Sequence, residues 1–159
     1  MRRTFSVPTD RSFIQMTEVV SAPLERAWVA RYEPLYVAQW WMPRGYVNSI
    51  VDIDLAPQGQ WRMCQRDPEG NEFSFYGHFT VVEPQVRTVQ TYVSELFPDV
   101  ETYLTTEFSE VARGTQIVTH HAFGDMSQRH GYLQLGGVER MTEASQHYDR
   151  LLSKLALGR

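Results

Sequence analysis

The sequence has very little lysine and cysteine, and it has no long apolar run. Lys154 is the only lysine, the arginines are scattered and the net charge is −4, so the concentrated basic patch of a nucleic-acid-binding protein is missing. A single cysteine, Cys64, excludes an internal disulfide and is typical of a reducing compartment. No apolar run approaches the roughly 20 residues that span a bilayer, and no secretory signal is recognisable. We therefore expect a cytoplasmic protein that binds no nucleic acid and inserts into no membrane.

Sequence patterns for metal and nucleotide sites are missing as well. His120 and His121 are neighbours on a predicted strand, so their side chains point to opposite faces and cannot bind one ion together. There is no nucleophile elbow, P-loop or dinucleotide-binding glycine pattern. We expect no metal, no cofactor and no assignable catalytic residue. One of His78, His120 and His121 is expected to be a polar group lining a pocket instead.

Apolar patterning and turn residues divide the chain into one ordered series of elements. Residues 13–20 predict a first strand, Ser21 and Pro23 predict the cap and first turn of a helix, and Pro34 opens a second short helix. From Leu133 to Leu155 apolar residues recur every three or four positions, which predicts one amphipathic helix of about six to seven turns. Turn signals between these helices separate six further strands, at residues 46–55, 60–66, 72–82, 86–93, 101–109 and 115–123.

These elements predict an α+β fold. A helix with one apolar stripe and an antiparallel sheet with one apolar face must cover each other. We expect a curved antiparallel sheet of about seven strands wrapped around a long C-terminal helix, with two short helices between strands 1 and 2. Gly59 and Gly77 are expected to form bulges that curve the sheet. The domain should span residues 11–157, preceded by a loose lead-in at residues 1–10, and a wedge of space should remain between sheet and helix.

Four segments of the sequence resemble a known family. They are Ser21-Ala22-Pro23 followed by Trp28, Gln39-Trp40-Trp41-Met42-Pro43, Pro57-Gln58-Gly59-Gln60-Trp61, and Gly136-Gly137-Val138-Glu139-Arg140-Met141. In order and spacing they are similar to the bacterial family named after the activator of heat-shock-protein-90 ATPase, in the START-like or SRPBCC superfamily. The resemblance runs from about residue 13 to residue 156, and it implies the helix-grip fold of the birch-pollen allergen, with a ligand cavity between sheet and helix.

Three positions depart from the pattern of that family. Gln58 stands where the family usually has the first of two glycines, Glu18 where the first strand usually carries arginine, and Arg140 where the last helix often carries a second glycine. Glu18 has the strand parity of inward-facing neighbours, and Arg140 lies at the edge of the apolar helix stripe. We predict that Glu18 and Arg140 form a partly buried ion pair at the margin of the cavity.

Aromatic residues make up 13% of the chain, more than turns and surface would hold. Ligand pockets are mostly apolar and aromatic, with a few polar groups that set the orientation of the ligand. The predicted ligand-binding residues are therefore mainly aromatic: Trp28, Trp41, Trp61, Phe75, Tyr76, His78, Tyr103, Met141, Ala144 and Tyr148.

The sequence leaves three functions open. The favoured one is binding of a small hydrophobic or aromatic ligand, lipid-like or polyketide-like, by a monomer or a homodimer. The second is an enzyme of the polyketide cyclase or dehydratase type in the same cavity, for which Glu18, Tyr76, His78 and Arg140 are the only acid or base candidates. The third, least favoured, is a co-chaperone of a heat-shock ATPase, because the eukaryotic form of that activity uses an additional domain.

Overall fold

The structure, a computed structural model, describes residues 2–158. Its eight strands form one antiparallel sheet in the order β1-β2-β8-β7-β6-β5-β4-β3. The strands are β1 (Arg2–Ser6), β2 (Phe13–Val20), β3 (Val47–Ile53), β4 (Gln60–Arg66), β5 (Glu72–Glu83), β6 (Arg87–Ser94), β7 (Thr102–Val111) and β8 (Gly114–Ala122). The helices are α1 (Leu24–Tyr32), α2 (Pro34–Trp40), α3 (Met126–Gln134) and α4 (Gly137–Gly158).

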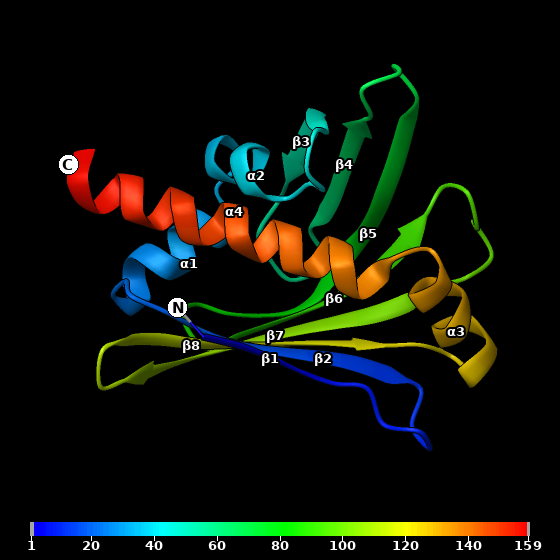
Figure 1. The fold of residues 1–159 in the computed structure, drawn as a ribbon, viewed down its shortest axis with the longest axis horizontal. Coiled ribbons are helices and arrows are strands. Elements are labelled where there is room, and N and C mark those ends of the chain that lie inside the picture. Colours follow the sequence, from blue (N-terminus) through cyan, green and yellow to red (C-terminus); the bar gives the residue numbers. More distant parts are fainter. Residues whose placement is uncertain (1, 159) are drawn as a thin grey trace.

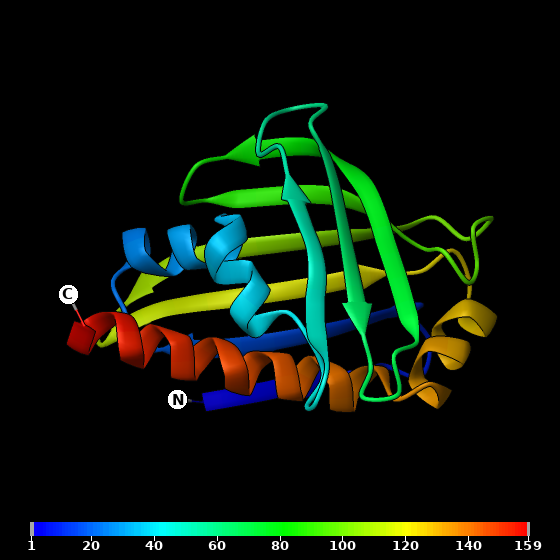
Figure 2. The same ribbon diagram turned by 90° about the horizontal axis from the view of Figure 1, so that it is seen from above.

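The sheet curves around the long helix α4. In Figure 1, β1, β2, β7 and β8 form a layer on one side of α4, while β3, β4 and β5 stand up behind it. Seen from above, α4 runs along the sheet, α1 and α2 lie near its C-terminal end, and α3 lies beyond its N-terminal end (Figure 2). Helices α1 and α2 both pack against α4. The predicted α+β helix-grip fold is confirmed.

Alternating burial along the strands shows which face of the sheet packs against α4. In β2 every second residue is buried, namely Ile14, Met16, Glu18 and Val20. In α4 the fully buried side chains include Tyr148 and Leu152, which lie on one face of the helix. The two apolar faces meet in a core that also contains rings from α1, α2 and the sheet: Trp28, Tyr32, Trp40, Trp61, Phe79 and Phe108.

Two predictions at the chain's start need correction. Residues 2–6 are not a loose lead-in but an eighth strand, β1, which pairs antiparallel with β2 from Arg2–Val19 to Ser6–Gln15. Its buried and exposed residues alternate only weakly because it is an edge strand, so it lacks the apolar pattern by which inner strands are recognised. The cap at Ser21 is also wrong, since Pro23 occupies the N-cap position of α1 and no side chain caps the helix.

The segment before α4 also differs from the prediction. Residues 126–134 form a separate helix, α3, so Leu133 belongs to α3 and not to α4. The Asp125 side chain caps α3 by accepting a hydrogen bond from the Gln128 backbone N–H at 2.8 Å. Gly136, with φ of 81°, then reverses the chain into α4, a backbone conformation that glycine adopts without strain.

The sheet bends at bulges that are not the predicted glycines. Register shifts lie between Asn48 and Ile50 on β3, and between Phe79 and Val81 on β5. Residues with side chains form both bulges, and no glycine marks either of them in the sequence. The glycine that the family usually has at position 58 does mark a special backbone conformation. Gln58 has φ of 70°, a left-handed conformation that favours glycine.

Gly77 serves a close approach between strands. It lies opposite Trp61 of β4, and the Trp61 indole N–H donates a 3.0 Å hydrogen bond to the Thr91 carbonyl on β6. A Cβ atom on Gly77 would lie 2.0 Å from that same carbonyl oxygen. Because Gly77 has no side chain, Trp61 of β4 can reach across β5 to the Thr91 carbonyl of β6.

Candidate functional site

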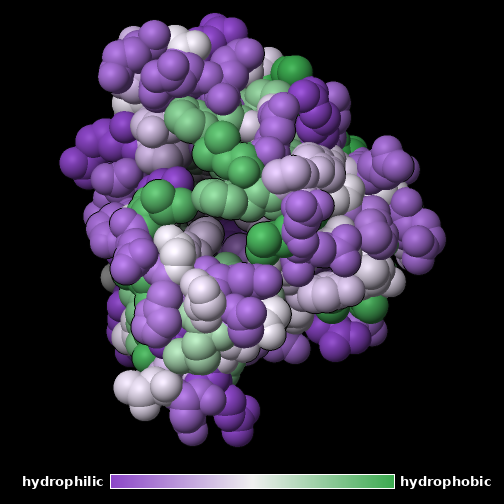
Figure 3. Space-filling model, turned by 90° about the vertical axis from the view of Figure 1, so that its right-hand side faces the viewer, coloured by the Kyte–Doolittle hydropathy of each residue, from purple (hydrophilic) through white to green (hydrophobic). Residues whose placement is uncertain are grey.

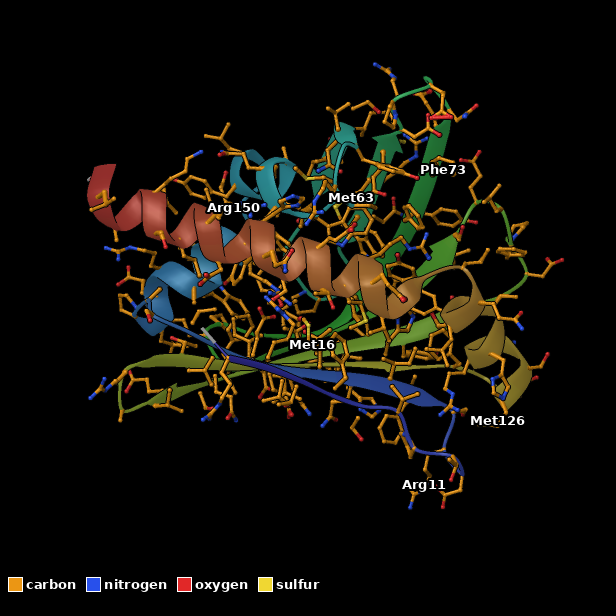
Figure 4. The ribbon with its side chains drawn as sticks, in the orientation of Figure 1. Arg11, Met16, Met63, Phe73, Met126 and Arg150 are labelled. Carbon is orange, nitrogen blue, oxygen red and sulfur yellow. The ribbon has the colours of Figure 1, made fainter. Side chains whose placement is uncertain are left out.

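A cavity of about 150 Å³ lies between the curved sheet and α4. Met16 of β2, beneath α4, and Met63 of β4, behind it, both line this cavity (Figure 4). The surface seen from the α3 end is hollowed, and hydrophobic residues rim the hollow (Figure 3). The lining residues come from α1 to α4 and from most strands of the sheet, so that only the folded chain assembles the cavity.

Aromatic rings form a continuous wall on the sheet side of the cavity. Trp41 meets Phe75 edge-on with ring centres 5.3 Å apart, and Phe75 contacts Tyr92 at 5.7 Å. Tyr92 in turn contacts Trp61 at 5.5 Å and His121 at 4.9 Å. All five rings line the cavity. Such a wall binds a planar apolar group through area burial and ring contacts.

A buried ion pair lines the cavity, and its partners correct a prediction. Glu18 faces inwards as expected and is fully buried, but its charged partner is Arg31 of α1, at 3.3 Å, and not Arg140. Arg31 also donates to the Thr119 hydroxyl at 3.0 Å, and Ser145 of α4 donates to the second Glu18 oxygen at 2.8 Å. Arg3 of β1 donates to Ser145 at 2.9 Å. This network ties β1, β2, β8, α1 and α4 together.

Arg31 remains charged in spite of its burial. Its guanidinium lies 4.8 Å from the ring centre of Trp40 and 4.8 Å from that of Tyr148, so two aromatic faces contact the cation. Burial lowers the pKa of Arg31, but the charge of Glu18 and the two neighbouring tyrosines outweigh that effect and raise the pKa overall. The Glu18–Arg31 pair therefore contributes no net charge to the cavity.

The α3 end of the cavity holds the side chain of Arg140 without an acidic partner. Its guanidinium lies 5.7 Å from the ring centre of Tyr132, and no described residue forms an ion pair or side-chain hydrogen bond with it. The hydroxyls of Tyr92 and Tyr132 likewise have no hydrogen-bond partner among residues 2–158. Burial raises the pKa of both tyrosines, against the opposing charge of Arg140, so both stay protonated donors at neutral pH.

His121 lines the cavity between these two regions. The Thr102 hydroxyl donates to the Tyr92 carbonyl at 2.9 Å, so its oxygen accepts from Nε2–H of His121 at 2.8 Å. Burial, and to a smaller extent the neighbouring His120, lower the pKa of His121 to about 3. The imidazole is therefore neutral at neutral pH. His121 confirms the expectation that one of three histidines lines the pocket.

Acid should destabilise the protein through His121. Its pKa is depressed in the folded state, whereas in the unfolded chain it returns to about 6.5, so the unfolded state binds the extra proton between these values. We expect the free energy of unfolding to fall by up to about 1.4 kcal/mol per pH unit from this group as the pH drops from about 6.5 towards 3. Urea unfolding at pH 7, 5.5 and 4 should show a flatter dependence in His121→Gln.

The matched control for that experiment is His130→Gln, at an exposed position of α3. It should keep the acid dependence of the parent protein. A wild-type slope retained in His121→Gln would mean that other groups cause the acid sensitivity.

The structure brings half of the predicted ligand-binding residues to the cavity. Trp41, Trp61, Phe75, Met141 and Ala144 line it. The other five do not line it, for reasons of strand parity or depth. Tyr76 and Tyr103 lie on the outer face of the sheet, 38% and 46% exposed.

The remaining three make contacts outside the cavity lining. The Tyr148 ring is fully buried in the core, and its hydroxyl donates to the Ala27 carbonyl. Trp28 packs in the core against Tyr32 and Phe108. The ring nitrogen Nδ1 of His78 lies 3.2 Å from the Thr91 hydroxyl.

Several polar lining residues escaped prediction. They include Arg31, Tyr32, Gln65, Gln90, Tyr92, Thr106, Thr119, Tyr132 and Ser145. Alternation along β8 from His121 could have indicated Thr119, since both face inwards. Arg140 lines the cavity as predicted from its place at the edge of the helix stripe, but no sequence signal separates Arg31 from the other helix arginines, because its role depends on how α1 packs.

Other kinds of site find no support in the described part of the chain. Residues 2–158 contain no cluster of three or more histidine, cysteine or acidic side chains that could hold a metal ion. Within the same residues, no helix is both long enough and apolar enough to cross a membrane.

Comparison with known families agrees with the geometry. The profile of the family described as "Activator of Hsp90 ATPase homolog 1-like protein" matches residues 21–156, which is most of the chain. The chain belongs to this family. Members share the helix-grip fold of the START-like, SRPBCC superfamily. Membership supports ligand binding in the cavity as a general role. No functionally curated protein matches the chain significantly in sequence.

Solved structures confirm the fold. A protein of Rhodobacter sphaeroides is 22% identical, with a TM-score of 0.87 over 96% of this chain and 99% of that one. A protein of Nitrosomonas europaea is also 22% identical, with a TM-score of 0.85 over 95% and 99%. A Silicibacter pomeroyi protein named AHSA1 is 19% identical, with a TM-score of 0.74 over 92% and 99%. At these identities the likeness concerns the fold alone.

Proposed function

We propose that this protein binds a small, mainly aromatic or apolar molecule in the cavity between its sheet and α4. The observation that carries the proposal is the continuous aromatic wall around a space of about 150 Å³. An apolar cavity of about this volume accommodates a molecule of one ring, such as benzene, whereas drug-sized ligands occupy about 300–1,000 Å³. Ring-sized compounds therefore fit better than long-chain lipids or multi-ring polyketides.

The acid and base candidates for an enzyme do not converge. Glu18 and Arg140 line the cavity, but Glu18 is held by Arg31 and Ser145, while Tyr76 and His78 do not line it. The enzymatic alternative therefore gains no supporting observation from the geometry. The description of the family names a heat-shock ATPase activator, and no feature of the cavity points to that activity.

Binding can be tested with a cavity-filling variant. Ala144 of α4 lines the cavity, and Ala144→Leu adds three carbon atoms inside it. In ¹H–¹⁵N NMR titrations of the wild type with toluene and with indole, we expect shifts centred on α4 around Met141 and Ala144. Ala144→Leu should weaken binding about tenfold or more, since the ligand and the new side chain compete for the same volume.

The matched control is Ala112→Leu, the same change in the exposed β7–β8 turn, which should bind as the wild type does. A flavone and dodecanol serve as larger probes, and tighter binding of either would show that the cavity enlarges and would overturn the ring-sized limit. The absence of shifts with every probe would refute the proposed function.

A further inference from the structure

The α3 end of the cavity combines three hydrogen-bond donors and no acidic group that pairs with them. The donors are the Arg140 guanidinium and the hydroxyls of Tyr92 and Tyr132, all of which line the cavity. Tyr132 links them, since its ring lies beneath Arg140 at 5.7 Å and 5.1 Å from the ring of His121. His121 in turn contacts Tyr92. The four side chains form one contiguous cluster, which we call the Arg140 cluster.

The charges that line the cavity do not balance. Glu18 and Arg31 neutralise each other at 3.3 Å, and His121 is uncharged at neutral pH. Arg140 is then the one charged lining side chain without an ion-pair partner among residues 2–158. A partly buried arginine that faces a cavity gains most from an oxyanion, because its fork of N–H groups matches a carboxylate.

The two tyrosines also favour an anion, because each offers a hydroxyl donor without an acceptor in the described part of the chain. A protonated phenol hydroxyl donates one hydrogen bond, and neither hydroxyl has a described acceptor. The elevated pKa of Tyr92 and Tyr132 keeps both as donors and not as competing phenolates. Beside the cluster, the wall is apolar and aromatic, formed by Trp41, Phe75 and Trp61.

We propose that the cavity selects a carboxylate carried on a single apolar ring, with the carboxylate bound by the Arg140 cluster and the ring against Trp41 and Phe75. This proposal rests on the proposed function, because it names the class of molecule that the cavity takes. Arg140 is the residue that determines specificity, and the tyrosine hydroxyls share the charge of the ligand. A single ring matches the volume of the cavity, and a carboxylate provides the acceptor that the three donor groups lack among residues 2–158.

Three probes with a single ring separate charge from shape. Benzoate carries the carboxylate, benzamide replaces it by a neutral group of the same shape, and toluene has neither. At pH 7 and low ionic strength, NMR titration or calorimetry should show benzoate binding at least about tenfold more tightly than benzamide or toluene, since hydrogen bonds to a charged group are the stronger ones. Salt should weaken the binding of benzoate and leave that of toluene unchanged.

Arg140→Met should remove the preference for benzoate and leave toluene binding within about twofold of the wild type. Arg150→Met is the matched control, because Arg150 is exposed on the same helix and does not line the cavity (Figure 4). It should retain the preference in full. Tyr132→Phe and Tyr92→Phe, which remove only the hydroxyls, should each weaken benzoate binding several-fold and have little effect on toluene.

The outcomes distinguish a failure of the carboxylate site from a failure of the proposed binding in the cavity. Toluene binding without a benzoate preference, or an equal loss of all three probes in Arg140→Met, would overturn the carboxylate site and leave the apolar cavity standing. An equal loss of benzoate in Arg150→Met would show that the effect is one of overall charge and would also overturn it. If no probe binds, the proposed function itself fails.

Discussion

Replacing Arg31 by methionine should destabilise the fold by about 3–5 kcal/mol, because Glu18 would remain as a buried charge without its ion-pair partner. Glu18 is 0% and Arg31 8% exposed, so water cannot solvate the remaining carboxylate as it would on the surface. Ser145 would still donate one hydrogen bond to Glu18. Urea or thermal unfolding at pH 7 measures the loss.

A double-mutant cycle separates the missing partner from the missing packing. In Arg31→Met with Glu18→Gln, the glutamine oxygen can still accept from Ser145, and no buried charge remains. We expect the double variant to be more stable than Arg31→Met alone. A double variant as unstable as the single one would mean that the contacts of Arg31 with Trp40 and Tyr148 supply most of the stability.

The surface provides a matched control for that substitution. Arg66 and Glu72 form a salt bridge at 3.0 Å, with side chains 49% and 54% exposed. Arg66→Met makes the same chemical change in a solvated pair and should cost less than about 1 kcal/mol. The contrast between the two arginines tests whether burial, and not the ion pair as such, determines the effect.

Replacing Gly77 by alanine should cost about 3 kcal/mol or more, at or above the upper end for overpacked sites. The new Cβ would lie 2.0 Å from the Thr91 carbonyl oxygen, which is backbone and cannot rotate away as a flexible side chain can. Strands β5 and β6 would have to separate, and the Trp61 hydrogen bond to the same oxygen would be strained. Unfolding by urea measures the stability, and the indole N–H signal of Trp61 in a ¹H–¹⁵N NMR spectrum reports its hydrogen bond.

Gly131→Ala is the matched control for Gly77→Ala. Gly131 lies inside α3, and a Cβ there would meet no atom within 4 Å. Alanine is favoured over glycine in helices by about 1 kcal/mol, so this variant should be slightly more stable than the wild type. Equal effects of the two changes would contradict the close-approach explanation for Gly77.

Local patterns were sufficient to predict most of the elements. The strands at residues 13–20 and 60–66 were predicted with the bounds that the structure has, since alternation of apolar residues and turn signals depend only on neighbours in the chain. The long amphipathic helix followed from its period. Strand β1 and helix α3 were missed because an edge strand and a short polar helix need no apolar stripe.

The site depended on contacts that no local pattern encodes. Strand parity placed Glu18 inwards correctly, but it could not identify the partner of Glu18. That partner is Arg31 because α1 packs against α4 and brings the Arg31 side chain to Glu18 and Thr119. Tyr76 and Tyr103 were misplaced for a related reason, since a pattern of alternating aromatics does not say which face of a bent strand is concave.

The sequence by itself therefore determined the order of most elements, the α+β arrangement of an antiparallel sheet around a long helix, and the existence of an aromatic-rich interior. These properties follow from periodicity and turn chemistry, which act over a few residues. Only the tertiary structure decided that Glu18 pairs with Arg31 and that Arg140 is left with Tyr92 and Tyr132 at the open end of the cavity. Pairing of charges is decided by distance in space, and packing sets that distance even for Glu18 and Arg31, which are only 13 positions apart in the chain.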